Sequence, residues 1–388
     1  MRLSKKPSSI FLILIIITLG SCLKKNITSN KMGLIPDSLQ KGIKSSSNAI
    51  DSSLIKLKVY NEAFDKIIHM LQNNNLDFKK AVFITENVYL NNILDYNKFN
   101  ATISSIVEDC HSFIIENKKG FKYDFIDREK TLKNAAIFQY FADTIKYTGS
   151  IFHSPFTYDF DDYAGEKDWT KMFVTKLLVT NSGNCHSLPY LYKIVANEMG
   201  TTAYLTFSPN HIYIKNKCKK TGWYNTELTS GDFPTDGWIM CSGYITNEAI
   251  ISGIYMDTLS QQQSVAYTLI DLAKGYEKKF GIGDGAFILK SCSACLNYYP
   301  NCINALLLKA ETQKKLFEAM MKNNNTQYVS EILNKPEAKA LYEDMEQTYG
   351  KIALSGYREM PEEMYKNWLK SLSQAKDEYS NRKVPMYK

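Results

Sequence analysis

Apolar residues recur at intervals of three and four positions through most of the first 150 residues, which is the spacing of an amphipathic helix. The first run begins near Ser52, the expected N-cap, and ends at the three asparagines of positions 73–75. Three further runs predict helices at about residues 77–89, 96–117 and 129–147. Residues 51–150 are therefore expected to form an all-helical N-terminal region.

The spacing changes in the middle of the chain. Helices are predicted at residues 169–180 and 190–199, the second ending at Gly200. Beyond Gly200, apolar and polar residues alternate in short segments that are separated by turns, which predicts antiparallel strands. The predicted strands span residues 203–207, 211–215 and 223–229, with one more at 238–244.

Helical spacing returns from Thr246 to the end of the chain. The expected fold class is therefore α+β, with a core of helix and antiparallel sheet at residues 151–255 flanked by helical regions. The C-terminal helical region is expected to occupy residues 256–388. Its predicted helices lie at about 262–276, 286–298, 305–316, 328–349 and 362–375.

Composition and charge exclude some classes of protein. The 388 residues are 44% hydrophobic and 13% aromatic, enough for a large buried core. The formal net charge is +7. Arg2, Lys5 and Lys6 contribute three of those charges, which leaves +4 (7 − 3) without them. No basic stripe with interleaved aromatic residues occurs, so a nucleic-acid partner is not expected.

The N-terminal residues have the pattern of a targeting signal. Residues 1–22 carry basic residues followed by an apolar run too short to span a bilayer. The run ends in Leu19-Gly20-Ser21-Cys22, which resembles the lipobox of bacterial lipoproteins, whose cysteine is acylated before cleavage. An ordinary secretory signal with an incidental Cys22 is the alternative. Residues 23–50, rich in Lys, Ser and Asn, are expected to be a flexible tether.

This signal predicts a lipoprotein of the cell envelope, held to the membrane by its N-terminal lipid. The residue after Cys22 is leucine rather than aspartate, which by resemblance favours the outer membrane, on its periplasmic or surface face. Seven cysteines remain beyond Cys22, and an odd number in an oxidising compartment leaves at least one free thiol. Cys292 and Cys295 have CxxC spacing but no second pair or histidine nearby, so we expect core residues there. No metal ion or cofactor is expected.

The chemistry centres on Cys185, which follows Gly183 and precedes a predicted helix. The N-terminus of a helix favours a thiolate, because free N–H groups and the helix dipole stabilise negative charge. His211, at the start of the next strand but one, is the expected base. Glu227 is the expected group that orients the histidine, and Asn225, with the same side-chain parity on its strand, is the alternative.

These segments resemble the transglutaminase-like branch of the papain-like superfamily. That family has G-x-C at a helix start, a G-H-x-W/Y-V strand and a W-x-x-x-D-P-T strand. Here the corresponding segments are Gly183-Asn184-Cys185, Asn210-His211-Ile212-Tyr213-Ile214 and Trp223-Tyr224-Asn225-Thr226-Glu227-Leu228-Thr229. Asparagine thus replaces the glycine before the histidine, and glutamate replaces the aspartate.

The resemblance extends over residues 52–320 to bacterial members with helices before the core and tetratricopeptide-like helices after it, here at residues 283–322. It implies that the loop with Asp232 and Phe233 borders the substrate cleft. It also implies a cysteine peptidase, amidase or transglutaminase-like acyltransferase that acts on peptide or protein substrates through an acyl-enzyme. Hydrolysis is favoured over transamidation, because hydrolysis needs no second binding site. The alternative is a non-catalytic binding or scaffold lipoprotein whose C-terminal helices hold a protein partner.

Overall fold

The computed structural model describes residues 46–147, 150–241 and 243–381. Contacts divide the chain into residues 1–49 and residues 50–388. The lipoprotein signal with Cys22, nearly all of the predicted tether and the C-terminal tail of residues 382–388 lie outside the described residues. Within the described part of the chain, no helix is both long and apolar enough to cross a membrane.

Four helices form the N-terminal region, as the spacing predicts. The predicted N-cap at Ser52 is wrong, because the first helix already begins at Ser46 and continues through Ser52. Asp77 and Asp95 cap the second and third, each accepting a hydrogen bond from a backbone N–H in the first turn. The predicted extension of the fourth helix to residue 147 is wrong, because the chain becomes extended at Asp143 and then forms a strand. The helices are α1 (Ser46–Gln72), α2 (Phe78–Tyr89), α3 (Tyr96–Asn117) and α4 (Arg128–Ala142).

Short elements connect this region to the core. The predicted helix at 169–180 is interrupted at Phe173, whose extended backbone separates a 3-10 turn from a short α-helix. The strands before and after these helices pair in parallel through Tyr158 and Gly183. The elements are β1 (Ile145–Tyr147), β2 (Ser150–His153), β3 (Thr157–Tyr158), η2 (Trp169–Met172), α5 (Val174–Thr180) and β4 (Ser182–Gly183).

The helix and antiparallel sheet predicted for the core are confirmed. Helix α6 ends before Gly200, whose φ of +65° suits glycine. The sheet has the order β5-β6-β7, with Ile214 opposite Thr226 and Ser208 opposite His211. The elements are α6 (Ser187–Glu198), β5 (Tyr204–Ser208), β6 (His211–Cys218) and β7 (Gly222–Thr226).

Helices make up the rest of the described chain. The strand predicted at 238–244 is wrong, because Thr235 caps a helix there by accepting a hydrogen bond from the Trp238 N–H. The single helix predicted at 328–349 is two helices, separated before Pro336. The helices are α7 (Asp236–Met240), α8 (Asn247–Ile251), α9 (Gln261–Phe280), α10 (Ala286–Tyr298), α11 (Ile303–Asn323), α12 (Val329–Ile332), α13 (Pro336–Leu354) and α14 (Glu362–Asn381).

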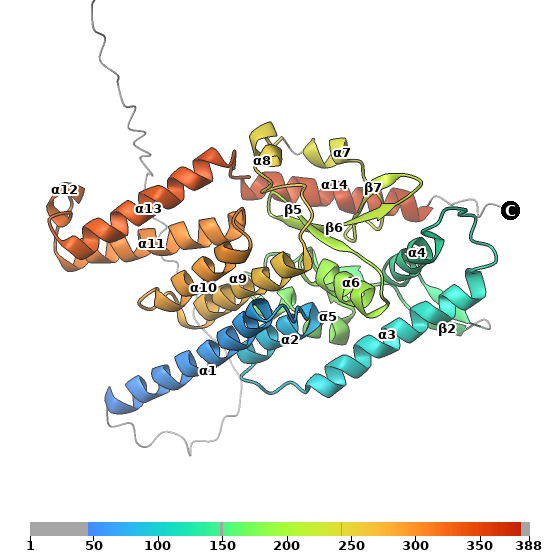
Figure 1. The fold of residues 1–388 in the computed structure, drawn as a ribbon, viewed down its shortest axis with the longest axis horizontal. Helices are drawn as coiled ribbons and strands as arrows, with labels where there is room; N and C mark the ends of the chain where they lie inside the picture. Colours follow the sequence, from blue (N-terminus) through green and yellow to red (C-terminus); the bar gives the residue numbers. More distant parts are fainter. Residues whose placement is uncertain (1–45, 148–149, 242, 382–388) are drawn as a thin grey trace, which may run out of the picture. The chain divides into compact units, whose positions relative to one another are not determined.

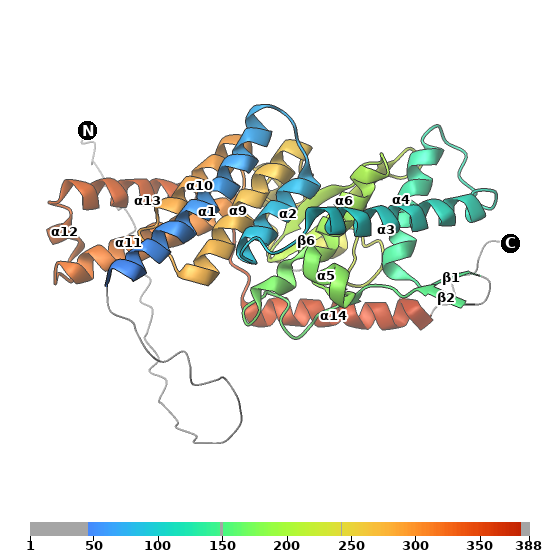
Figure 2. The ribbon, with the colours of Figure 1, turned by 90° about the horizontal axis from the view of Figure 1, so that it is seen from below.

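The fold class is α+β, with a small antiparallel sheet among many helices, as Figures 1 and 2 show. Helix α6 lies at the centre of the main hydrophobic core, and Leu191, Ile194 and Val195 are fully buried. Burying side chains of this size is the main stabilising contribution to such a core. The core therefore holds the start of α6, and the cysteine before it, in a fixed place.

Candidate active site

The loop before α6 holds Cys185 through the side chain of Asn184. The Asn184 Oδ1 accepts hydrogen bonds from the N–H groups of His186 and Ser187, at 3.0 and 3.1 Å, and so satisfies the exposed start of the helix. Its Nδ2 donates to the Tyr163 carbonyl at 2.9 Å. Gly183 is required by space, because a Cβ there would lie 2.6 Å from Ser187 Oγ. The Gly-Asn-Cys sequence thus has a local structural reason.

His211 and Glu227 meet on one face of the sheet. Continuing the register of Ile214 with Thr226 places residue 227 opposite residue 213, which shares its face with His211. The His211 Nε2 donates to Glu227 Oε2 at 2.7 Å, and Glu227 Oε1 accepts from the Thr229 N–H at 2.8 Å. The Nδ1 edge of the imidazole is therefore left to face Cys185.

Asn225 does not take the role that its parity allowed. Asn225 lies opposite Lys215, four positions along β6 from His211, whereas Glu227 lies beyond the end of the pairing and closer to His211. The Asn225 Nδ2 donates to the Pro234 carbonyl at 2.9 Å and to Asp236 Oδ1 at 2.8 Å, so it holds the following loop. The structure thus brings Glu227 to the histidine and turns Asn225 away from it.

The three groups support one another's charge inside the protein. Cys185, His211 and Glu227 expose only 8%, 3% and 3% of their surface. Burial opposes the charge on His211, but the adjacent Glu227 carboxylate and Cys185 outweigh burial and raise the pKa of His211 to about 10. Burial likewise opposes the thiolate, yet the hydrogen bond and positive charge of His211 hold the pKa of Cys185 below its ordinary value. Each group thus favours the charged form of the other, a thiolate beside an imidazolium.

Two tyrosines that the sequence did not suggest lie beside the thiol. Tyr158, on β3, has its hydroxyl close enough to the thiol and the N–H of Cys185 to affect the pKa of the tyrosine, and within the described residues that buried hydroxyl has no hydrogen-bond partner. Tyr365, on α14, has its hydroxyl 3.4 Å from Cys185 Sγ and 3.4 Å from His211 Nδ1. Burial raises the pKa of both tyrosines well above the ordinary value, so both hydroxyls keep their protons. Both tyrosines are far from Cys185 in the sequence, so no local sequence pattern indicated that they reach the thiol.

A cavity of about 870 Å³ opens beside Cys185. The core and the C-terminal region both line it, the latter through Tyr267 and Lys274 of α9 and Tyr357 of the loop after α13. Asp232 and Phe233, the residues predicted to border the cleft, are not among its lining residues.

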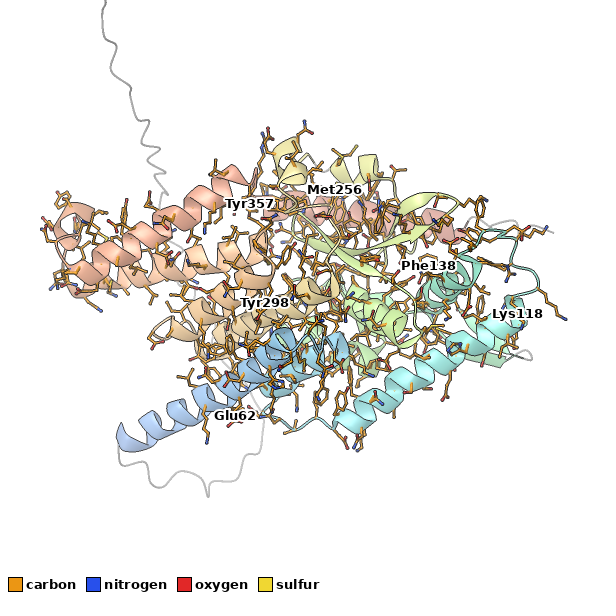
Figure 3. The ribbon with its side chains drawn as sticks, in the orientation of Figure 1. Glu62, Lys118, Phe138, Met256, Tyr298 and Tyr357 are labelled. Atoms are coloured by element: carbon orange, nitrogen blue, oxygen red, sulfur yellow. The ribbon has the colours of Figure 1, made fainter. Side chains whose placement is uncertain are left out.

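Those two residues instead stabilise the loop after β7. Asp232 pairs with Glu227 through the backbone and accepts a hydrogen bond from Ser230 Oγ at 2.7 Å. Phe233 packs against Phe138 of α4, with ring centres 4.4 Å apart. Figure 3 labels Phe138 well apart from Tyr357, which lines the cavity. The loop with Asp232 and Phe233 therefore supports the sheet rather than the cavity.

His186, the residue after Cys185, has a structural role. His186 lies 2.8 Å from the Met172 carbonyl through Nδ1 and 3.0 Å from Asp271 Oδ1 through Nε2, and Asp271 also accepts from the Tyr190 hydroxyl at 2.7 Å. These bonds tie the start of α6 to α9. His186 is thus occupied by structural hydrogen bonds and is turned away from the reaction.

Within the described ranges, the other cysteines form no disulfide and no metal-binding cluster is present. The seven described cysteines are free thiols, and Cys292 and Cys295 are fully buried in α10, where core residues were expected. No group of three or more His, Cys, Asp or Glu side chains in this part of the chain is placed to hold a metal ion.

Comparisons of the chain with models of protein families, with curated proteins and with solved structures find no match.

Proposed function

We propose that this protein is a cysteine acyl-transfer enzyme that acts on peptide or amide bonds through Cys185, His211 and Glu227. The observation that carries the proposal is the assembly of the three side chains, with His211 held between Glu227 and the thiol. A nucleophile, a base and an orienting carboxylate in this order are the components of covalent acyl transfer. The N-terminal signal adds a lipid-anchored place in the cell envelope to the proposal.

The same geometry supports a transglutaminase-like, papain-like core. Helix α6 follows the cysteine, and the histidine and carboxylate come from the next strands in the order of that family. Asn210 stands where the family has glycine, and its φ is +57°. Asparagine is among the few residues other than glycine that tolerate this conformation, so the substitution keeps the turn.

The proposed reaction begins with attack of the Cys185 thiolate on the substrate carbonyl carbon. A tetrahedral intermediate forms, and its oxygen carries the negative charge. The Tyr158 hydroxyl lies close to the thiol and the N–H of Cys185, and we propose that this hydroxyl and this N–H donate to that oxygen. The imidazolium of His211 then gives its Nδ1 proton to the leaving amine as the C–N bond breaks, which leaves an acyl-enzyme.

Water or a second amine then attacks the acyl-enzyme, and His211 takes the proton of the attacking group. The thiolate leaves, which restores the starting pair. Glu227 keeps the Nε2 proton in place through both halves. We propose hydrolysis as the main outcome, with the cavity of about 870 Å³ beside Cys185 receiving the acyl donor.

The pH dependence of Cys185 alkylation tests the pair. With iodoacetamide and mass spectrometry of the Cys185 peptide, we expect the rate to persist well below the ordinary thiol pKa of about 8.5. In His211→Ala the reactivity at pH 7 should fall, because burial raises the pKa of the thiol and the two largest opposing effects, the hydrogen bond and positive charge of His211, are gone. Comparing the shapes of the two pH profiles removes the effect of slow access to the buried thiol.

Cys241 provides an internal reference, because it is exposed. Its alkylation profile should be the same in the natural chain and in His211→Ala. A Cys185 profile that follows that of Cys241, unchanged in the variant, would contradict the enzyme proposal and favour the non-catalytic binding protein.

Tyr158→Phe separates nucleophile activation from stabilisation of the intermediate. Because alkylation creates no oxyanion, its rate at Cys185 should be unchanged. Acylation of Cys185 by an activated ester such as p-nitrophenyl acetate should slow by about 100-fold, the usual effect of removing one oxyanion donor. Equal slowing of both reactions would show that Tyr158 only shapes the site.

A further inference from the structure

We infer that α14 is an autoinhibitory latch, which closes the site over Cys185 and has to move before a substrate can reach the thiol. The inference rests on the proposed function for its consequence, since a latch inhibits only if the site it covers is active. Its evidence is separate, and lies in the contacts of one helix face with the site.

The first of these contacts occupies the space of the reaction. The Tyr365 hydroxyl lies 3.4 Å from both Cys185 Sγ and His211 Nδ1, so it contacts the nucleophile and the proton donor together. The carbonyl and leaving group of a substrate have to occupy that same space, because the thiolate attacks there and His211 gives its proton there. Substrate and Tyr365 therefore exclude one another.

A second aromatic side chain closes the other side of the imidazole. The Trp368 ring packs edge-on against His211, with ring centres 4.7 Å apart, and also contacts the Trp238 ring of α7 at 6.0 Å. Tyr365 in turn packs on Tyr163 of the loop before the core, at 5.2 Å. Aromatic rings from α14 and from the core thus narrow the approach to Cys185 and His211, which line the cavity together with Tyr365.

The latch is held by one stripe of the helix. Tyr365, Leu369 and Leu372 are buried, with Trp368 between them, at the spacing of a single helical face. Lys366, Asn367 and Lys370 face solvent, and so does Met364 just before the stripe, which is 44% exposed. Figures 1 and 2 show α14 running alongside the sheet, while α13 belongs to the helices that precede it. A helix held by one face can leave without unfolding the core.

The segment before α14 is anchored separately from the helix. The Thr246 Oγ1 donates to the Gly356 carbonyl at 2.9 Å, and a Cβ on Gly356 would lie 2.6 Å from the Ala249 nitrogen of α8. This close packing fixes the chain just after α13. Nearer the helix, the Asn210 Nδ2 donates to the Met360 carbonyl at 3.2 Å, next to His211. The fixed point and the latch are thus different parts of the chain, as a hinged segment requires.

The closed state also leaves a polar group unsatisfied. The Trp368 Nε1 is buried and has no hydrogen-bond partner among the described residues. A buried donor without a partner favours any state in which water reaches it. Opening the latch would hydrate this N–H, so the closed state carries a cost that opening removes.

Alkylation of Cys185 in the full-length chain tests the latch. Trp368→Ala should raise the rate by about tenfold or more, because the loss of the ring shifts the population toward the open state. The matched control Met364→Ala removes a side chain of the same helix on its exposed face and should leave the rate within about twofold of the natural chain. Alkylation of the buried Cys292 in α10 reports unfolding, and it should stay blocked in both variants.

A second measurement adds a synthetic peptide of residues 359–381 to Trp368→Ala, which should slow alkylation of Cys185 again. The latch is overturned if Cys185 of the natural chain already reacts as fast as the exposed Cys241, or if Trp368→Ala reacts no faster than Met364→Ala. The two proposals fail differently. If Trp368→Ala accelerates alkylation of Cys185 and the acceleration does not depend on His211, the latch proposal stands and the enzyme proposal is contradicted.

Discussion

Glu227→Ala is expected to lose acyl transfer at Cys185 and to unfold more readily than the natural chain by about 3–5 kcal/mol. The loss of stability is expected because the variant leaves two buried groups without their partner. The imidazole of His211 would have no carboxylate, and the Thr229 N–H would have no acceptor. Without Glu227 the pKa of His211 falls, and the thiol loses the positive charge that lowers its own pKa. Urea unfolding and the pH profile of Cys185 alkylation measure the two effects.

Two further variants, one at position 227 and one at position 225, control this experiment. Glu227→Gln keeps an acceptor for the imidazole without the charge, so it should retain most of the stability while the alkylation profile still moves to higher pH. Asn225→Ala should affect the loop that the amide holds and leave the profile in place, because Asn225 does not contact His211. An alanine variant at 227 as stable as the natural chain would show that the His211 pair carries no net stabilisation.

The second large effect is expected at Glu86, away from the thiol. This buried carboxyl of α2 accepts hydrogen bonds from the N–H groups of Val174 and Thr175, at 2.7 and 2.9 Å. It thereby caps α5, whose N-cap residue Phe173 has no side-chain acceptor. Helix α5 leads directly into the Gly183 loop, so Glu86 links the N-terminal helices to the placement of Cys185.

Burial raises the pKa of Glu86 from 4.5 to about 7. Between these values the folded chain keeps a proton that the unfolded chain releases, so raising the pH from 4.5 to 7 costs stability. The expected cost is about 3 kcal/mol, since one pKa unit corresponds to about 1.4 kcal/mol. Glu86→Gln cannot ionise and should lack this loss, so relative to the natural chain it gains stability across the same range.

Urea unfolding of both chains at pH 4.5 and pH 7 measures the change in their difference, in which all other titrating groups cancel. Glu62→Gln, an exposed position on α1, is the matched control and should show a pH-independent difference. The same pH-independent difference at Glu86→Gln would mean that the two N–H donors, rather than burial, set the pKa of Glu86.

The sequence alone determined the elements whose signals are local. Apolar spacing marks the four N-terminal helices, Gly200 marks a helix end, and alternation marks the strands of the sheet. These signals are reliable because caps, turns and side-chain parity depend on neighbours within a few residues. The same local order singled out Cys185, His211 and Glu227, which the structure brings together.

Only the tertiary structure decided which side chains meet when local rules allowed more than one answer. Parity placed Asn225 and Glu227 on one face, and the sheet register then brought Glu227 nearer to His211. A strand is predicted for residues 238–244, but Thr235 caps a helix there. Tyr158 and Tyr365 reach the thiol from 27 and 180 positions away in the chain, and their own neighbours carry no trace of it. Such contacts depend on how elements pack, which the pattern of one helix or strand cannot contain.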